Sequence, residues 1–295
     1  MTMRFAFIGF GEAGGLIAKG LRESGAEIAA VYDTLIHQPA KAEALRQKAG
    51  AIGINVAADA AEAVAGADII LSAVVSSQMV TAARNVAPHL KPGQIYLDIN
   101  STSPMAKQEA AGVVENSGAD YVEAAVMDLV PPHGHKVPMF LAGKAAARLS
   151  PILNGLGMKT EAIGEAIGTA STIKMVRSVF LKGFSAILLE SLVAASKVGA
   201  QEQVLDSLQV TFPQIDWRQM SDYYALRLIK HAKRQASEMH EVAETLDFLG
   251  LEPLTALATA KRLEWLAEFN LQDGPAIDGY PALLAALAAR GERAS

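Results

Sequence analysis

The chain has 295 residues, of which 51% are hydrophobic and 19% charged, so it can form two domains with sizeable cores and is not typical of a disordered protein. A formal net charge of −5 and the lack of any dense run of lysine or arginine argue against a nucleic-acid partner. The sequence has no cysteine, which excludes disulfides, thiolate catalysis and zinc–thiolate sites.

The first predicted unit is a strand, a glycine-rich turn, a helix and a second strand. An apolar run at residues 4–8 leads into the turn, which is followed by a helical pattern at 16–21 and a strand pattern at 28–33. In this arrangement the first glycine allows a tight turn, the second lets backbone approach a pyrophosphate, and the third lets helix and strand pack closely. The N–H groups of the helix N-terminus face the phosphates. The pattern predicts a dinucleotide-binding domain whose turn residues contact the cofactor: Gly9, Phe10, Gly11, Glu12, Ala13 and Gly14.

Asp33 ends the second predicted strand, where a carboxylate can accept hydrogen bonds from the ribose diol of the cofactor. The same carboxylate would repel the 2′-phosphate that distinguishes NADP from NAD. The predicted cofactor is therefore NAD in preference to NADP.

The rest of the first half alternates strand-like and helix-like segments. Short apolar strand patterns cover residues 67–75, 94–99, 120–126 and 138–142. Strands separated by helices predict a parallel sheet covered on both faces, an α/β doubly wound Rossmann-type fold. Ligands of such sheets bind beyond the carboxyl ends of the strands, so Val74, Val75 and the loop at 100–104 are expected beside the cofactor.

From about residue 166 onward, strand patterns end and helical patterns take over. A long helix is predicted over residues 166–197, followed by helices near 201–211, 217–249, 253–269 and 280–290. We therefore expect a NAD-binding Rossmann domain at 1–165 and an all-α domain at 166–295, which completes the substrate cleft and the dimer interface. The alanine- and leucine-rich run at 282–289 favours burial against a second subunit, so a homodimer or higher oligomer is expected.

Further expectations concern membranes, location and metals. No apolar run of eighteen residues is recognised and the N-terminus enters a strand at once, so we expect a cytoplasmic protein without a membrane span. His133 and His135 lie in a Pro-Pro-His-Gly-His loop, which we interpret as a solvated loop and not a metal site.

The long predicted helix carries two cations near its start. At about 100° per residue, one apolar stripe is formed by Ile173, Val176, Phe180, Phe184, Ile187 and Leu188. Lys174 lies at the edge of this stripe and Arg177 lies inside it. Both side chains could extend from the helix end into solvent. Alternatively they line an interdomain cleft, where Lys174 would exchange a proton with a substrate carbonyl oxygen while hydride arrives from nicotinamide.

Two motifs resemble the β-hydroxyacid dehydrogenase family, which is related to 6-phosphogluconate dehydrogenase. The family pattern has a glycine, a catalytic lysine six residues later and an asparagine three residues after that, and Gly168 and Lys174 match its first two positions. The segment Asp-Ile-Asn-Ser-Thr-Ser-Pro at 98–104 resembles the family loop that contacts the nicotinamide side, here through Thr102. The segment 231–243 resembles a group with a C-terminal domain of unknown function, some members of which are linked to phenylserine oxidation.

The chain departs from the family pattern at the substrate loop. The family's Asp-Ala-Pro-Val-Ser-Gly-Gly corresponds here to Glu-Ala-Ala-Val-Met-Asp-Leu, so Met127 replaces the serine that binds a substrate carboxylate. Arg177 replaces the family asparagine, and a guanidinium can form a bidentate pair with a carboxylate. We expect Arg177, Met127 and Asp128 to bind substrate. In the alternative, Arg177 pairs with an internal acid such as Asp128 or Glu123.

The predicted function is hydride transfer between nicotinamide and a β-hydroxy acid or related alcohol, with room for a bulky or aryl group near Met127. The family resemblance also includes a Lys-Asp pair near the end of the family pattern, which aligns loosely with Lys230 and His231 here. This alignment implies that Lys230 contacts the cofactor. One alternative is an imine reductase, which shares the layout but usually has another residue at the position of Lys174. Another is a non-catalytic NAD-sensing protein, favoured only by the altered substrate loop. Hydride transfer needs no metal.

Overall fold

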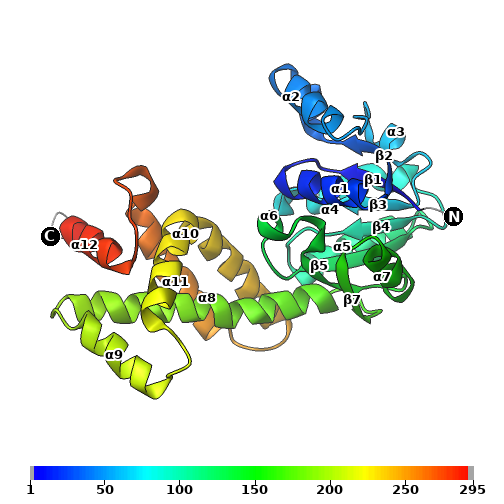
Figure 1. The fold of residues 1–295 in the computed structure, drawn as a ribbon. Helices are drawn as coiled ribbons and strands as arrows, with labels where there is room; N and C mark the ends of the chain where they lie inside the picture. Colours follow the sequence, from blue (N-terminus) through cyan, green and yellow to red (C-terminus); the bar gives the residue numbers. More distant parts are fainter. Residues whose placement is uncertain (1–2, 292–295) are drawn as a thin grey trace. The chain divides into compact units, whose positions relative to one another are not determined.

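The computed structural model describes residues 3–291. The chain divides into two compact units, Met1–Lys174 and Met175–Ser295. Among the described residues, the first unit holds one seven-stranded sheet in the order β2-β1-β3-β4-β5-β6-β7 (Figure 1). Its strands are β1 (Arg4–Ile8), β2 (Glu27–Tyr32), β3 (Ile69–Ser72), β4 (Ile95–Asp98), β5 (Asp120–Val126), β6 (Pro138–Ala142) and β7 (Lys159–Gly164).

Helices cover both faces of this sheet. Phe5 and Phe7 of β1 share a core with α1 and α7 on one face, while Ile8 packs with α3, α4 and α5 on the other. This alternation follows from the strand pleat, which points successive side chains to opposite faces. The helices of the first unit are α1 (Glu12–Glu23), α2 (Pro39–Gly50), α3 (Ala60–Val64), α4 (Met79–Val86), α5 (Pro104–Glu115), α6 (Val130–His133) and α7 (Ala146–Gly155). The predicted doubly wound architecture is confirmed.

The sheet differs from the prediction at one edge. Strands β5 and β6 pair antiparallel, whereas every other neighbouring pair is parallel in the described residues. The segment between β5 and β6 contains only the short α6 and a 3₁₀ turn at Gly134–Lys136, and a parallel connection needs a longer crossover. Strand β7 was not predicted, because its sequence Lys-Thr-Glu-Ala-Ile-Gly is only partly buried and has no apolar run.

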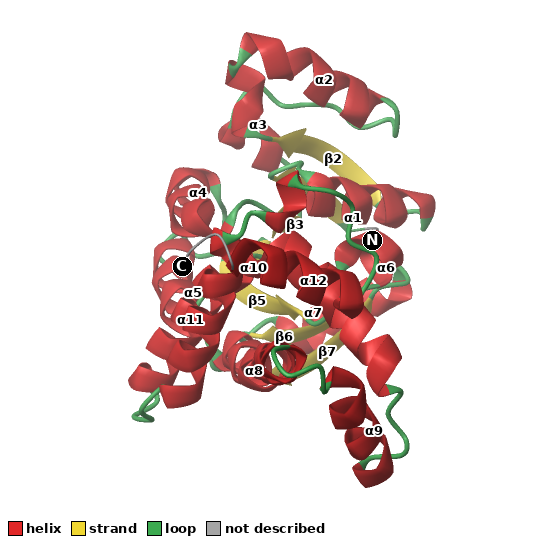
Figure 2. Ribbon diagram, turned by 90° about the vertical axis from the view of Figure 1, so that its left-hand side faces the viewer, coloured by secondary structure: helices red, strands yellow, loops and turns green. Residues whose placement is uncertain are grey.

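The second unit is helical, drawn in red in Figure 2. It contains most of α8 (Thr169–Ser196), then α9 (Gln201–Thr211), α10 (Trp217–Phe248), α11 (Leu254–Glu268) and α12 (Tyr280–Gly291). These helices begin and end close to their predicted positions. Shorter 3₁₀ turns are Thr34–His37, Ser76–Gln78, Ala87–His89, Gly134–Lys136 and Leu271–Asp273.

The apolar run in α12 is buried within its own unit. Leu283, Leu284 and Leu287 belong to the core of the helical unit, together with Met239 and Leu263. The prediction that this run needs a second subunit for burial was therefore wrong, because α8 and α10 of the same unit supply the partner surface.

The predicted buried stripe of α8 is also wrong for most of its members. Four members of the stripe are exposed: Ile173, Val176, Phe180 and Ile187. Leu188 is buried as predicted, on a side of the helix that also carries Met175, Leu189 and Leu192. The apolar residues of α8 extend around more of the helix than one stripe, so their spacing alone does not select the packed face.

Helix α8 is long and apolar enough to cross a membrane by length and composition, with a mean hydropathy of 1.6 over its best window. The expectation that no such run exists was therefore wrong. This is weak evidence for a span, because a core helix of a soluble protein passes the same test.

Candidate active site

The glycine-rich turn between β1 and α1 has the geometry of a phosphate-binding loop. Gly9 has a φ of +90°, and a Cβ there would lie 2.4 Å from the carbonyl oxygen of Ala73. A Cβ on Gly14 would lie 2.5 Å from the carbonyl oxygen of Gly9. By contrast, a Cβ on Gly11 would meet no atom of the described residues within 4 Å. The protein itself gives Gly11 no steric reason to be glycine, and the open space suits a pyrophosphate.

Asp33 fixes this turn through the backbone. Its Oδ2 accepts from the N–H of Phe10 at 2.8 Å, and its Oδ1 accepts from the N–H of Leu35 at 3.0 Å. Each carboxylate oxygen has two lone pairs, so Asp33 keeps acceptor capacity for a ribose diol. Asp33 thus holds the loop as well as lying at the predicted ribose position.

Lys48 of α2 holds the same turn from its carbonyl side, which the sequence did not predict. Its Nζ donates to the carbonyl oxygens of Phe10 at 2.8 Å and Gly11 at 2.7 Å, and lies 4.8 Å from the centre of the Phe10 ring. Burial lowers the pKa of the Lys48 ammonium, while the charges of Asp33 and Glu12 oppose that shift. A lysine on an exposed helical stretch carries no sequence signal for this contact.

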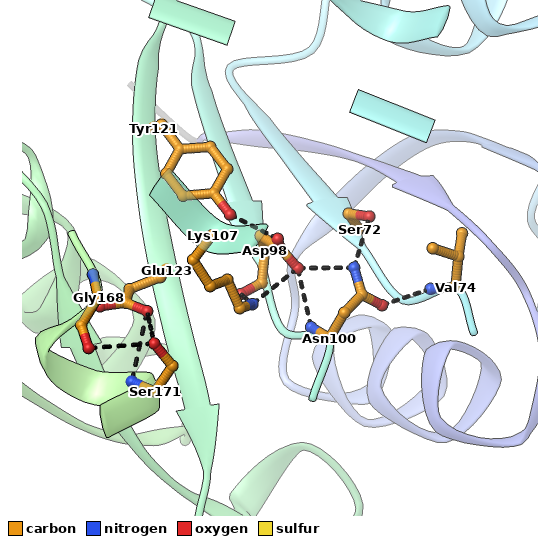
Figure 3. Close-up of polar contacts among 9 residues, drawn as sticks. All are labelled: Ser72, Val74, Asp98, Asn100, Lys107, Tyr121, Glu123, Gly168 and Ser171. Carbon is orange, nitrogen blue, oxygen red and sulfur yellow. Dashed lines mark hydrogen bonds and ion pairs between the residues drawn. The ribbon is translucent and has the colours of Figure 1, made fainter. Parts of the chain in front are cut away.

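A buried polar network lies at the carboxyl ends of β3 and β4 and includes Tyr121 from β5 and Lys107 from α5 (Figure 3). The Nζ of Lys107 lies 3.0 Å from Oδ1 of Asp98, and both side chains are inaccessible, at 1% and 0% exposure. The Tyr121 hydroxyl donates to Oδ2 of Asp98 at 2.5 Å. Burial, and then the charge of Asp98, raise the pKa of Tyr121 well above its ordinary value. In the sequence, only the acidic Asp98 at the end of an apolar strand pattern indicates this network. The residues that bind Asp98 from α5 and β5 could not be inferred, because they lie on other elements.

Asn100 connects this network to the predicted cofactor-side loops. Its Nδ2 donates to Asp98 Oδ1 at 2.6 Å and to Ser72 Oγ at 3.0 Å, and its Oδ1 accepts from the N–H of Val74 at 2.7 Å. Thr102 follows in the same loop and is buried, whereas Val75 is exposed. The network therefore fixes the backbone at Val74 and the start of the loop that carries Thr102.

The start of α8 is held by Glu123 of β5. Its buried carboxylate accepts from the N–H groups of Gly168 at 2.7 Å, Ala170 at 3.0 Å and Ser171 at 3.3 Å, and from the Ser171 hydroxyl at 2.8 Å. Lys174, the predicted acid–base, follows Ser171 by about one helical turn and is half-buried.

The predicted substrate residues occupy several elements. Met127 is partly buried against a small cluster formed with Ala125, Ala142 and Ala170. Asp128 lies at the protein surface, where its Oδ2 is 3.2 Å from Nε2 of His133. The two remaining predicted residues, Arg177 on α8 and Lys230 on α10, are exposed and belong to the second unit. Their binding roles stay predictions.

The histidine loop differs from its sequence interpretation at His135, which is buried and not solvated. Its Nε2 lies 3.1 Å from Oγ of Ser24, and a Cβ on Gly20 would overlap its ring. Burial lowers the pKa of His135, and the charge of Lys136 lowers it further. Among the described residues, no group of three or more His, Asp or Glu side chains could hold a metal ion.

The cofactor preference can be measured by fluorescence titration with NADH and NADPH. We expect tighter binding of NADH, because the Asp33 carboxylate would face the 2′-phosphate of NADPH. In the Asp33→Ser variant this preference should shrink, although some loss of affinity for both cofactors is expected because Asp33 also holds Phe10. Equal or tighter binding of NADPH by the wild-type protein would contradict the prediction.

Comparison with known proteins agrees with this geometry. Residues 4–164 match the NAD binding domain of 6-phosphogluconate dehydrogenase, and residues 195–266 match a domain of unknown function. A solved structure of a conserved hypothetical protein from Sinorhizobium meliloti 1021 is 40% identical, with 98% of this chain and 97% of that chain covered and a TM-score of 0.86. The match therefore extends over both units.

Two further relatives bear on the reaction. A conserved protein of unknown function, whose structure is described as similar to 3-hydroxyacid dehydrogenases, is 30% identical over 92% of this chain and 99% of its own, with a TM-score of 0.76. The 2-(hydroxymethyl)glutarate dehydrogenase of Eubacterium barkeri is 24% identical over 70% of this chain and 68% of its own. These similarities indicate an NAD(P)-dependent oxidoreductase like the 3-hydroxyacid dehydrogenases. The chain belongs to the family defined by the NAD-binding domain of 6-phosphogluconate dehydrogenase, as its sequence motifs predicted.

Proposed function

We propose that the protein is an NAD-dependent dehydrogenase of a β-hydroxy acid or related alcohol, with Lys174 as its acid–base. The observation that carries the proposal is the placement of the start of α8. Pro104 begins α5 directly after the Thr102 loop, and Gln108 of α5 donates to the carbonyl oxygen of Ile167 at 3.1 Å. The helix that carries Lys174 is thus fixed to the element that follows the predicted nicotinamide-side loop.

The chemistry divides between the cofactor and the chain. When bound at the glycine-rich turn, NAD would supply the hydride acceptor for oxidation of the alcohol carbon, and NADH the hydride donor for the reverse reaction. The Lys174 amine takes the proton of the hydroxyl group during oxidation, and its ammonium returns a proton to the oxygen during reduction. Asp33 and Lys48 hold the turn that binds the cofactor phosphates.

The finer substrate proposal rests on Arg177. It lies three residues after Lys174, about 60° away around the helix axis, so both side chains point from neighbouring positions of α8. We propose that its guanidinium binds the substrate carboxylate, because Met127 cannot. An apolar or aryl substituent would then lie near Met127.

The Arg177→Asn variant tests this role. We expect a rise of about tenfold or more in KM for carboxylate substrates, which corresponds to losing a charge-assisted hydrogen bond. The Arg177→Lys variant keeps the charge without the bidentate geometry, so its KM should lie between those of the wild-type protein and Arg177→Asn. Unchanged KM, or a loss of folded protein in thermal unfolding, would assign Arg177 a structural role instead.

A substrate screen tests the reaction class. Purified protein with NAD or NADP would be assayed against 3-hydroxypropionate, 3-hydroxyisobutyrate and phenylserine, and with NADH or NADPH against cyclic imines. Oxidation of a hydroxy acid supports the proposal. Reduction of imines alone would favour an imine reductase, and cofactor binding without turnover of any compound would favour a sensing role.

We also propose that the protein forms a homodimer through the helical unit. Phe180 and Ile187 of α8 are 73% and 66% exposed in the single chain, and large exposed apolar side chains favour a partner surface. Multi-angle light scattering at micromolar concentration should give at least twice the chain mass. A species of 31.0 kDa would contradict this proposal.

A further inference from the structure

We propose that Glu123 is a positioning residue for Lys174, acting as a cap from the sheet that fixes the first turns of α8. The inference rests on the proposed function, because it takes Lys174 as the acid–base. Glu123 does not itself touch substrate or cofactor in this proposal. It acts through the backbone of residues 168–171.

The Glu123 carboxylate contacts several backbone groups at the start of α8 at once. A helix N-terminus has N–H groups without partners inside the helix, and a nearby carboxylate binds them strongly because the helix dipole is positive there. Glu123 accepts from three such N–H groups and from the Ser171 hydroxyl. Its side chain is fully buried, so these charge-assisted bonds are shielded from water.

The cap on α8 comes from a strand and not from the helix itself. An ordinary N-cap is the residue at the start of the helix itself, whose side chain accepts from N–H groups of the first turn. Here the carboxylate comes from β5, 45 positions earlier in the chain than Gly168. The cap therefore ties the helix start to the sheet and not to its own loop.

The same turn has a second attachment, to α5. Gly168 has a φ of +103°, and a Cβ there would lie 3.0 Å from Nε2 of Gln108 and 3.2 Å from Cβ of Pro104. Close approach to α5 therefore requires glycine at this position. Glu123 and α5 together hold the turn from two directions.

The sheet connects the Glu123 cap to the loops predicted to face the cofactor. Ser72, Asp98 and Glu123 are register partners across β3, β4 and β5. From this one row, Ser72 and Asp98 bind Asn100, and Glu123 binds the start of α8 (Figure 3). The sheet thus serves as a common frame for the backbone at Val74 and for the turn before Lys174. Proton transfer requires the acid within hydrogen-bond reach of the reacting oxygen, so a shift at this turn would act on catalysis directly.

The test is the Glu123→Gln variant, which keeps the shape of the side chain but removes the charge and places an N–H₂ group against N–H donors. We expect kcat on the fastest substrate among 3-hydroxypropionate, 3-hydroxyisobutyrate and phenylserine to fall by about a hundredfold, since a displacement of about 1 Å can cost that much. The Kd for NADH should stay within about twofold, because the glycine-rich turn makes no contact with Glu123. Glu161→Gln, an exposed acid on β7 of the same sheet, is the matched control and should keep wild-type kcat.

A second readout does not depend on a substrate. Labelling of Lys174 by trinitrobenzenesulfonate, followed by peptide mass spectrometry, reports the availability of its amine. Loss of the negative charge near the helix start disfavours the ammonium form, so labelling should reach its half-maximum at lower pH in Glu123→Gln. A role confined to stability would lower the melting temperature without moving this profile.

The milder Ser171→Ala variant covers the case in which Glu123→Gln does not fold. It removes only the hydroxyl contact with the carboxylate, and kcat should fall several-fold with the Kd for NADH unchanged. The inference would be overturned if folded Glu123→Gln had the kcat and the labelling profile of the wild-type protein. If Glu123→Gln does not fold, the same result in Ser171→Ala would overturn it. If Lys174→Ala kept its kcat, the proposed function would fail on its own. If Lys174→Ala lost kcat as expected while Glu123→Gln kept the wild-type kcat and labelling profile, only this inference would be rejected and the proposed function would stand.

Discussion

Replacing Lys174 by alanine is expected to lower kcat by about a hundred- to ten-thousand-fold, the usual cost of removing a general acid–base. The loss should appear in kcat more than in the affinity for NADH, because the predicted cofactor contacts are at the turn between β1 and α1 and not at Lys174. Stopped-flow measurement of hydride transfer, together with fluorescence titration of NADH, separates the two quantities.

Two controls make the Lys174 result specific. Lys197→Ala removes an exposed lysine shortly after the C-terminal end of α8 and should leave kcat unchanged. Added methylamine should restore part of the activity of Lys174→Ala, because a small amine can supply the missing proton donor. A variant that retains more than about a tenth of the wild-type kcat would remove Lys174 from the mechanism and favour the imine reductase alternative.

The parts of the fold that could be predicted from the sequence are those governed by local patterns. Such a pattern is formed by Gly9 and Gly11 between β1 and α1, Gly14 in the first turn of α1 and Asp33 after β2. The backbone close to Gly9 and Gly14 requires glycine at both positions. Strands β5 and β6 were predicted at their observed bounds, since each is an apolar run delimited by polar residues or turns. The helices of the second unit were delimited by glycine and proline in the same way.

The features that escaped prediction depend on contacts between distant segments. The antiparallel pairing of β5 with β6 follows from the path of the chain between them, and β7 is recognisable as a strand only through its partner β6. The exposed face of α8 could not be inferred because apolar residues occur around most of its circumference. Whether a given face is buried is decided by α10, α11 and α12, whose positions no local pattern specifies.

In the candidate site, too, residues in local motifs could be predicted and residues that act across distant segments could not. Gly9, Gly14 and Asp33 were singled out by spacing, and Thr102 and Lys174 by resemblance. The residues that hold them in place were not: Lys48 acts on a turn 37 positions earlier, and Glu123 on a turn 45 positions later. Supporting contacts of this kind join elements that only the folded sheet brings together.

The second large effect is expected in the buried ion pair of the first unit. Replacing Lys107 by methionine leaves Asp98 in the interior without its cation, while the hydrogen bonds from Tyr121 and Asn100 stay in place. Breaking a buried pair by removing one partner costs about 3–5 kcal/mol of unfolding free energy, because the remaining charge has lost both solvent and counter-charge. Urea denaturation followed by circular dichroism measures this loss.

Comparison with two other variants identifies the cause of the loss. Arg84→Met breaks the exposed pair between α4 and α5, in which Arg84 and Glu109 are 61% and 51% accessible, and should cost less than about 1 kcal/mol. The double variant Lys107→Met/Asp98→Asn removes both buried charges and should recover much of the stability lost in Lys107→Met, because an uncompensated charge is more costly than a neutral amide in the same place. If the double variant is instead as unstable as the single one, the lysine stabilises the sheet through packing and its bond to the Asp98 carbonyl, and the electrostatic explanation of the pair is wrong.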